Sequence, residues 1–226
     1  MGRFPKVDFS YRILRDKVPE SSQPPKASHM QFPVNLNIAG RPCLLVGGGR
    51  IALRKAQQLL ACGADLTVLA PDILPDFFDL GVRTVERAYQ HGDLAAYRLV
   101  VTATGNIEVD QQIFNEAEAL GIWVNSADDP DRCSFTLPAV LRQGSVMVTV
   151  STGGASPALS SWLRRELEEL IGPEFAEIAA VLAAKRAQVH AEGASTEDID
   201  WKPIIEEVIA THGVQSLSRR EMEVAR

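Results

Sequence analysis

The sequence has few of the residues that mark metal-binding, disulfide-bonded or membrane-spanning proteins. Its three cysteines, Cys43, Cys62 and Cys133, lie far apart and form no CxxC pair, so no zinc motif or disulfide framework is expected. The four histidines are scattered and predict no metal site. No apolar run approaches the ~18–20 residues that a membrane-spanning helix needs, and the N-terminus lacks the apolar core of a signal peptide. We expect a cytoplasmic protein with reduced thiols.

The sequence also lacks an excess of positive charge. Its 23 Lys and Arg residues against 29 Asp and Glu residues give a net charge of −6, which does not favour binding to nucleic acid or to acidic membrane surfaces. The aromatic residues form no stacking ladder of the kind that binds single-stranded nucleic acid. A small-molecule ligand is therefore the expected partner, in a chain of 226 residues that can hold one full domain and a smaller one.

One stretch predicts a dinucleotide site. An apolar run from Cys43 to Val46 is followed by three glycines and then by a helical pattern that ends near Gly63. This pattern predicts a strand, a tight turn and a helix. The residues of the turn match the motif G-x-G-x-x-A, with Gly47, Gly49 and Ala52 at the key positions. Gly47 allows a sharp turn, Gly49 allows a pyrophosphate to approach the backbone, and Ala52 allows the helix to pack closely on the strand. The alternative is a plain glycine turn.

Strands and helices then alternate. The further strands are expected at 65–69, 83–86, 98–104 and 122–125, with a short helix at 73–80 and a longer one at 107–120. This order predicts an α/β fold with a Rossmann-like, doubly wound parallel sheet. Ligands of such sheets bind at the carboxyl ends of the strands, so the loops after the first, fourth and fifth strands are the expected site.

The second strand ends at Pro71 and Asp72. An acidic side chain at this place can accept hydrogen bonds from the adenosine ribose; the alternative is that Asp72 only caps the following helix. No arginine follows at once to bind a 2′-phosphate, which favours NAD over NADP.

After about residue 130 the pattern changes. Two β-rich runs, 134–141 and 145–151, flank a Gln143-Gly144 turn and predict a hairpin. Three helices follow at about 158–171, 174–191 and 198–211. We predict an NAD-binding domain at 30–142, a central dimerisation region at 143–172 and a C-terminal helical region at 173–226. Residues 1–29, with their polar Pro-rich segment, are interpreted as a vector-derived leader or a flexible extension.

Two loops outside the glycine turn are candidates for chemistry. Asp128 follows the fifth strand and could act as a general base, while Asp129 precedes a proline and is expected to be extended; the alternative is an ordinary Asx-Pro turn. The loop 151–157 is rich in small residues and precedes a helix with Ser156 as N-cap, a geometry that binds anions, unless it is only a connection. Arg54-Lys55 and Arg164-Arg165 could bind carboxylates, although such residues more often form a solvated face.

Three motifs in this order resemble one family. They are Val46 to Lys55, Asn125 to Pro130 and Ser151 to Pro157, preceded by Phe32-Pro33-Val34. Together they are similar to the precorrin-2 dehydrogenase/sirohydrochlorin ferrochelatase family, the N-terminal module of siroheme synthase. The resemblance covers about residues 32–190. It implies a homodimer in which NAD⁺ oxidises precorrin-2 to sirohydrochlorin, with Fe²⁺ insertion as a second activity in some relatives.

The resemblance also implies roles for individual residues. Asp128 matches the aspartate implicated in both steps. Positions that contact NAD are matched by Arg50, Ile51, Pro71 and Asp72, and we add Thr104, because the nicotinamide is expected beside the loops 102–105 and 125–128. Binding of the tetrapyrrole substrate is assigned to five residues: Asn125, Thr152, Gly153, Gly154 and Ser156. Thr152 stands where some relatives carry a phosphorylatable serine, and Gly105-Asn106 replaces residues that are acidic in several relatives. The alternatives are a dehydrogenase without chelatase activity and a non-catalytic NAD(H)-binding dimer.

Overall fold

The computed structural model describes residues 31–127 and 129–214. By its internal contacts the chain divides into two units, 1–34 and 35–226. Of the first unit only 31–34 are described, and these are exposed and lack regular structure. The predicted leader 1–29 and the candidate catalytic residue Asp128 lie outside the described residues.

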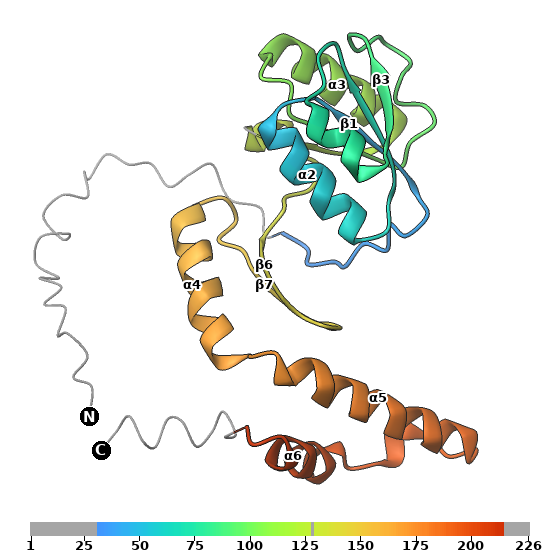
Figure 1. The fold of residues 1–226 in the computed structure, drawn as a ribbon, viewed down its shortest axis with the longest axis vertical. Helices are drawn as coiled ribbons and strands as arrows, with labels where there is room; N and C mark the ends of the chain where they lie inside the picture. The colour runs from blue at the N-terminus through green and yellow to red at the C-terminus, as the bar shows by residue number, and fades with distance from the viewer. Residues whose placement is uncertain (1–30, 128, 215–226) are drawn as a thin grey trace, which may run out of the picture. The chain divides into compact units, whose positions relative to one another are not determined.

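The second unit begins with a five-stranded parallel sheet. Its strands are β1 (Pro42–Val46), β2 (Asp65–Ala70), β3 (Arg83–Glu86), β4 (Leu99–Thr102) and β5 (Trp123–Ser126), in the order β3-β2-β1-β4-β5. Helix α2 (Arg50–Ala61) connects β1 to β2, and α3 (Ile107–Leu120) connects β4 to β5 (Figure 1). This is the predicted Rossmann-like, doubly wound fold, in which the chain order reverses between β1 and β4.

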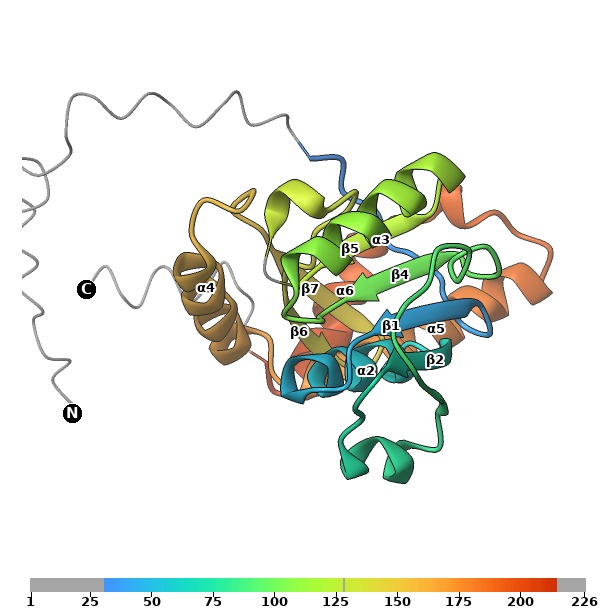
Figure 2. The same cartoon turned by 90° about the horizontal axis from the view of Figure 1, so that it is seen from above.

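The two helices cover opposite faces of the sheet (Figure 2). Side chains of a strand alternate between its faces, and β1 divides accordingly. Cys43 and Leu45 belong to the core that contains Ala52 and Ala56 of α2, whereas Leu44 and Val46 belong to the core that contains Ile113 and Ala117 of α3. From Cys43 to Val46 every residue of β1 belongs to one of the two cores, which is why this stretch is a continuous apolar run.

A small antiparallel hairpin and three helices follow the sheet. The hairpin consists of β6 (Ala139–Gln143) and β7 (Val146–Val150). The helices are α4 (Pro157–Leu170), α5 (Glu174–Ala191) and α6 (Trp201–Thr211). Short 3₁₀ helices occur at Pro75–Leu80, Pro130–Arg132 and Thr196–Asp198. Within the described part of the chain, no helix is both long and apolar enough to cross a membrane.

Three predicted boundaries were wrong for local reasons. The first hairpin run was expected from 134, but β6 begins at Ala139, because the backbone N–H of Ser134 donates to Val124 O (2.9 Å) and residue 134 returns alongside β5. The last helix was expected from 198 but begins at Trp201, where the side chain of Asp200 caps it. The helix expected at 73–80 is a 3₁₀ helix that starts at Pro75.

The connection between β3 and β4 contains no helix and is held by one buried carboxylate. Glu116 of α3, 4% exposed, accepts from the hydroxyl of Tyr89 and from the backbone N–H groups of Gly92 (3.0 Å) and Leu94 (3.2 Å). His91 Nδ1 lies 2.9 Å from the same carboxylate. Burial opposes ionisation of Glu116, but these hydrogen bonds outweigh it and lower the pKa of the carboxyl. The loop is therefore fixed to α3.

Replacing Glu116 with glutamine is expected to lower the free energy of unfolding by roughly 3 kcal/mol at neutral pH, because an amide cannot accept all three donors. A lowered folded-state pKa adds stability that is complete above the ordinary value of 4.5 and is lost as the pH falls through the folded-state value. The difference between the wild type and Glu116→Gln should therefore shrink in acid. Urea unfolding across this range measures it. Glu118→Gln, at an exposed position of the same helix, should change stability by less than about 0.5 kcal/mol, and a pH-independent difference would contradict the assignment.

Candidate functional site

The glycine loop after β1 is wedged between two other segments at the carboxyl edge of the sheet. Gly47 has φ +134°, and a Cβ on it would lie 2.4 Å from the carbonyl oxygen of Ala103, just after β4. A Cβ on Gly48 would lie 2.0 Å from the carbonyl oxygen of Asp72, just after β2. Both contacts are to backbone atoms, which cannot move aside as a flexible side chain could. Only glycine fits at these two positions.

Gly49 differs from the other two glycines. It is the N-cap of α2 with φ −90°, and a Cβ on it would meet nothing within 4 Å. No side chain caps α2, and its first turn contains no acidic residue. The free N–H groups and the positive end of the helix dipole therefore face open space, which is the arrangement that binds a phosphate group.

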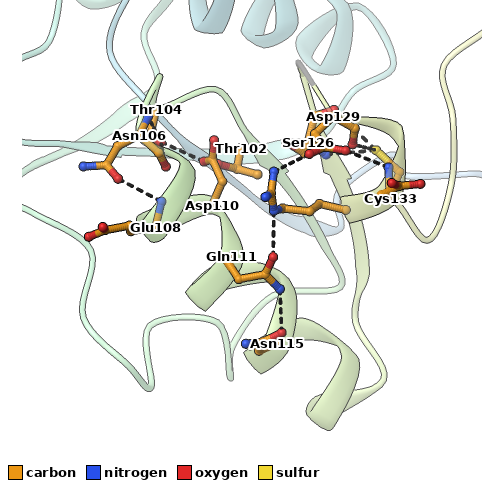
Figure 3. Close-up of polar contacts among 12 residues, drawn as sticks. Thr102, Thr104, Asn106, Glu108, Asp110, Gln111, Asn115, Ser126, Asp129 and Cys133 are labelled. Carbon is orange, nitrogen blue, oxygen red and sulfur yellow. Dashed lines mark hydrogen bonds and ion pairs between the residues drawn. The ribbon is translucent and has the colours of Figure 1, made fainter.

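The other helix at this edge of the sheet is unsuited to a phosphate. The side chain of Asn106 caps α3 by accepting from the backbone N–H groups of Glu108 (3.0 Å) and Val109 (3.2 Å). Glu108 and Asp110 add two carboxyl groups to its first turn (Figure 3). Because these groups occupy the N–H donors and repel anions, a pyrophosphate fits at α2 and not at α3.

The structure brings the other predicted cofactor residues to the same edge. Arg50 and Ile51 begin α2, and Pro71 and Asp72 follow β2; all four are exposed. The alternative that Asp72 caps the next helix was wrong, because the N-cap there is Leu74 and no side chain caps it. The backbone of Asp72 instead contacts the glycine loop through Gly48.

At the end of β4 two hydroxyl groups converge on one carboxylate. Thr102 and Thr104 both donate to Oδ1 of Asp110, the latter over 2.7 Å (Figure 3). Thr102 is 0% and Asp110 8% exposed, and the Thr104 hydroxyl also accepts from the backbone N–H of Asn106 (3.0 Å). Thr104 therefore lies where the cofactor was expected, with its hydroxyl bound to the protein.

The loop after β5 is closed by the thiol of Cys133. The sulfur accepts from the backbone N–H of Ser126 (3.2 Å) and donates to the carbonyl oxygen of Asp129 (3.2 Å), and burial raises the pKa of the thiol. The side-chain amide of Asn125 donates to Phe135 O (3.0 Å). These bonds join both ends of the short segment that contains Asp128. The amide of Asn125, predicted to bind substrate, contributes to the shape of this loop.

Asp129 is extended, as predicted, with φ −139° and ψ 107°. Its carboxylate accepts from the backbone N–H of Asp131 (2.8 Å) and pairs with Arg132, whose Nε donates to Gln111 Oε1 of α3 (2.8 Å). Figure 3 shows this chain of contacts from the loop to the helix. Asp129 therefore has a structural role in the loop.

The second glycine-rich loop uses many of its own donors. The N–H of Gly153 donates to Ser151 Oγ (3.2 Å), that of Ala155 to Thr152 O (3.1 Å) and that of Ser156 to Thr152 Oγ1 (3.0 Å). Ser156 caps α4 by accepting from Leu159 N–H (3.2 Å), as predicted. Gly153 and Gly154 have positive φ and open space where a Cβ would lie. The assignment of this loop to the substrate stays a prediction.

The basic residues after the two glycine loops differ in their surroundings. Arg54 and Arg165 are exposed, and Arg164 pairs with Glu168 over 2.7 Å on α4, a solvent-facing i, i+4 pair. Within the described residues, no group of three His, Cys, Asp or Glu side chains is placed to hold a metal ion.

Comparison with known proteins shows which families the chain resembles. Residues 34–139 match a family model described as "Putative NAD(P)-binding", and residues 143–170 match one described as "Sirohaem biosynthesis protein central". Siroheme synthase 2 of Aeromonas salmonicida is 46% identical over 62% of this chain, and the siroheme synthase of Chromobacterium violaceum is 36% identical over 85% of it. The chain is therefore similar to these two families and to part of the siroheme synthases. Its cofactor domain is accordingly of the nicotinamide-binding type.

The chain spans only part of these siroheme synthases, 30% of the Aeromonas protein and 43% of the Chromobacterium protein. Among solved structures, one described as "SirC, precorrin-2 dehydrogenase" has a TM-score of 0.63 and 23% identity, and the match covers 81% of this chain and 99% of that one. This likeness confirms the fold of the sheet, the hairpin and the helices.

Three residues of this site were not predicted to take part in it. Gly48 occupies a variable position of the motif, and only the approach of β2's end reveals why it is glycine. Cys133 and Asp110 act through contacts with residues close in the chain but on other elements. A pattern of residue types carries no signal for such contacts.

Proposed function

We propose that this chain catalyses the NAD⁺-dependent oxidation of precorrin-2 to sirohydrochlorin in siroheme biosynthesis, in the cytoplasm. The observation that carries the proposal is the uncapped N-terminus of α2 behind a glycine loop that only glycine can form. The relationship to siroheme synthases supports the choice of substrate, and the dehydrogenase named among the similar structures agrees with the reaction class.

The residues at the sheet edge have separate tasks in this proposal. Gly47, Gly49, Arg50 and Ile51 hold the pyrophosphate end of the cofactor, Pro71 and Asp72 the adenosine ribose, and Thr104 the nicotinamide end. NAD is preferred over NADP for two reasons. No arginine follows β2 directly to pair with a 2′-phosphate, and the carboxylate of Asp72 would repel the negative charge of that phosphate.

The oxidation removes two electrons and two protons from precorrin-2. One proton leaves with both electrons as the hydride that the nicotinamide accepts, and the second must go to a base. We assign that base to Asp128, because the neighbouring carboxylate of Asp129 is already paired with Arg132. Backbone groups of the loop 152–156 orient the carboxylate-rich tetrapyrrole.

A second activity is Fe²⁺ insertion into sirohydrochlorin, with iron as substrate. The metal would displace two pyrrole N–H protons, of which Asp128 would accept one and solvent the other. Precorrin-2 and NAD⁺ are incubated anaerobically with the protein, and NADH absorbance reports the oxidation. Fe²⁺ or Co²⁺ is then added, and the spectrum of the macrocycle reports chelation. NADH formation without chelation would make the chain a dehydrogenase only; cofactor binding without NADH formation would make it a non-catalytic NAD(H)-binding protein.

We further propose that α4 and the hairpin contact a second copy of the chain. Leu159, Trp162 and Leu170 lie on one face of α4 and are 46%, 48% and 36% exposed, and Val140 of β6 is 37% exposed. Large apolar side chains gathered on one helix face mark an interaction surface. Leu159, Trp162 and Leu170 lie within the segment that matches the siroheme biosynthesis central family.

Trp162→Glu is expected to convert the dimer to a monomer, because a carboxylate buried in an apolar interface lacks a partner. Size-exclusion chromatography with light scattering measures the mass. Ser161→Glu is the matched control, since residue 161 is exposed but lies on another side of α4, and it should leave the mass unchanged. A monomeric wild type, or a dimeric Trp162→Glu variant, would contradict the proposal.

A further inference from the structure

The carboxylate of Asp110 is buried at the end of β4 without a cationic partner. It is 8% exposed, and its Oδ1 accepts from the hydroxyls of Thr102 and Thr104. The ion pairs among the described residues join other groups and leave Asp110 out. Two hydroxyl donors satisfy a carboxylate oxygen but do not cancel its negative charge.

This charge lies next to the proposed cofactor site. Thr102 and Thr104 flank Ala103, whose carbonyl oxygen would be 2.4 Å from a Cβ on Gly47. The end of β4 is therefore packed directly on the glycine loop, and the two threonines fix Asp110 to it (Figure 3). The first turn of α3 has its N–H donors capped by Asn106, so the buried carboxylate of Asp110 makes the β4 end a negative region.

A negative region distinguishes the two redox forms of the cofactor. The oxidised nicotinamide ring carries a positive charge, and the reduced ring is neutral. A fixed carboxylate in a poorly solvated place attracts the cationic form, and the attraction is screened less than it would be in water. The same carboxylate has little effect on the neutral form.

We propose that Asp110 sets the preference of the cofactor site for the oxidised over the reduced nicotinamide. The proposal rests on the proposed function, because it requires the nicotinamide end of the cofactor to lie at the β4 end. Asp110 acts from within the protein, through a position that Thr102 and Thr104 determine, and is a specificity-determining residue that does not touch the reacting atoms. It would favour capture of the oxidised cofactor and leave the affinity for the reduced one nearly unchanged.

The test is the ratio of the dissociation constants for NAD⁺ and NADH, measured by calorimetry without tetrapyrrole. Asp110→Asn keeps an oxygen that accepts from both hydroxyls and removes the charge. It is expected to weaken NAD⁺ binding on the order of tenfold relative to NADH, the size of a charge interaction at partly buried sites. Glu108→Gln removes an exposed carboxylate from the same helical turn. This control should change the ratio less than about twofold, because solvent screens an exposed charge.

A second variant covers the case in which Asp110→Asn does not fold. Thr102→Val with Asp110→Leu replaces the buried donor and its acceptor by apolar side chains of similar shape, a change that is often nearly neutral for stability, and the Thr104 hydroxyl can donate to Asn106 O (3.2 Å) instead. It should shift the ratio in the same direction. An unchanged ratio, or equal weakening of NAD⁺ and NADH, in a folded variant would overturn the proposal. A wild type that binds neither nucleotide would instead overturn the proposed function.

Discussion

Replacing Gly49 with alanine is expected to weaken cofactor binding strongly while leaving the protein folded. A Cβ at this position meets no protein atom within 4 Å, and alanine for glycine at an N-cap costs about 1 kcal/mol or less. The methyl group would occupy the space in front of the free N–H groups of α2, where the pyrophosphate must come close. Affinity for NAD⁺ should fall on the order of 100-fold, the upper end of what overpacking a tight contact costs.

Gly48→Ala, in contrast, should destabilise the fold. Its Cβ would lie 2.0 Å from Asp72 O and 2.8 Å from Ile73 Cα, so the turn after β2 must move. The free energy of unfolding should fall by roughly 3 kcal/mol, as it does when an overpacked side chain displaces backbone. Urea unfolding and calorimetric titration with NAD⁺ on both variants separate the two effects. Equal destabilisation by the two substitutions would show that the glycine loop is not packed as described.

The sheet could be predicted from sequence because its strands are buried on both faces. Runs such as Leu99–Thr102 are continuous and largely apolar, and glycines follow the helices between them. The hydrophobic pattern and the glycine positions therefore indicate the same boundaries for these elements. The strand at 83–86 and the helix at 107–120 have the predicted bounds. Prediction was less accurate where a segment pairs with a distant partner. Residues 134–138 are as β-prone as the strand that follows, but Ser134 pairs with Val124 of β5.

The glycine loop could be predicted as a cofactor site because its chemistry is local. The turn, the small residue at 52 and the helix start all lie within a few residues of one another. What the sequence could not show is which donors remain available. The loops 151–157 and 47–50 are both rich in small residues and precede a helix, yet the N–H groups of Gly153 and Ser156 donate within their own loop, whereas α2 has no side-chain cap. Availability depends on tertiary contacts, and residue types alone do not reveal it.

Replacing Asp128 with asparagine is expected to lower turnover of precorrin-2 by about 100-fold or more, the contribution typical of a general acid or base. Asparagine has nearly the same size and can still accept a hydrogen bond, but it cannot take up the proton released on oxidation. NAD⁺ should still bind the variant, because the residues assigned to the pyrophosphate and the adenosine ribose lie on other loops. Anaerobic NADH formation under saturating substrate measures turnover, and calorimetry measures cofactor affinity.

The neighbouring carboxylate provides the matched control for this prediction. Asp129→Asn can still accept from the backbone N–H of Asp131, and it loses only the charge that faces Arg132. An ion pair that is partly exposed contributes little, so turnover should stay within about fivefold of the wild type. The two substitutions make the same chemical change one residue apart. If Asp129→Asn were the more damaging, the catalytic carboxylate would be the one that pairs with Arg132, and that arginine would keep it ionised for proton transfer. If neither substitution lowered turnover, the proton would leave through a group outside this loop. That result would contradict the assignment of Asp128 and would leave the proposed cofactor site unaffected.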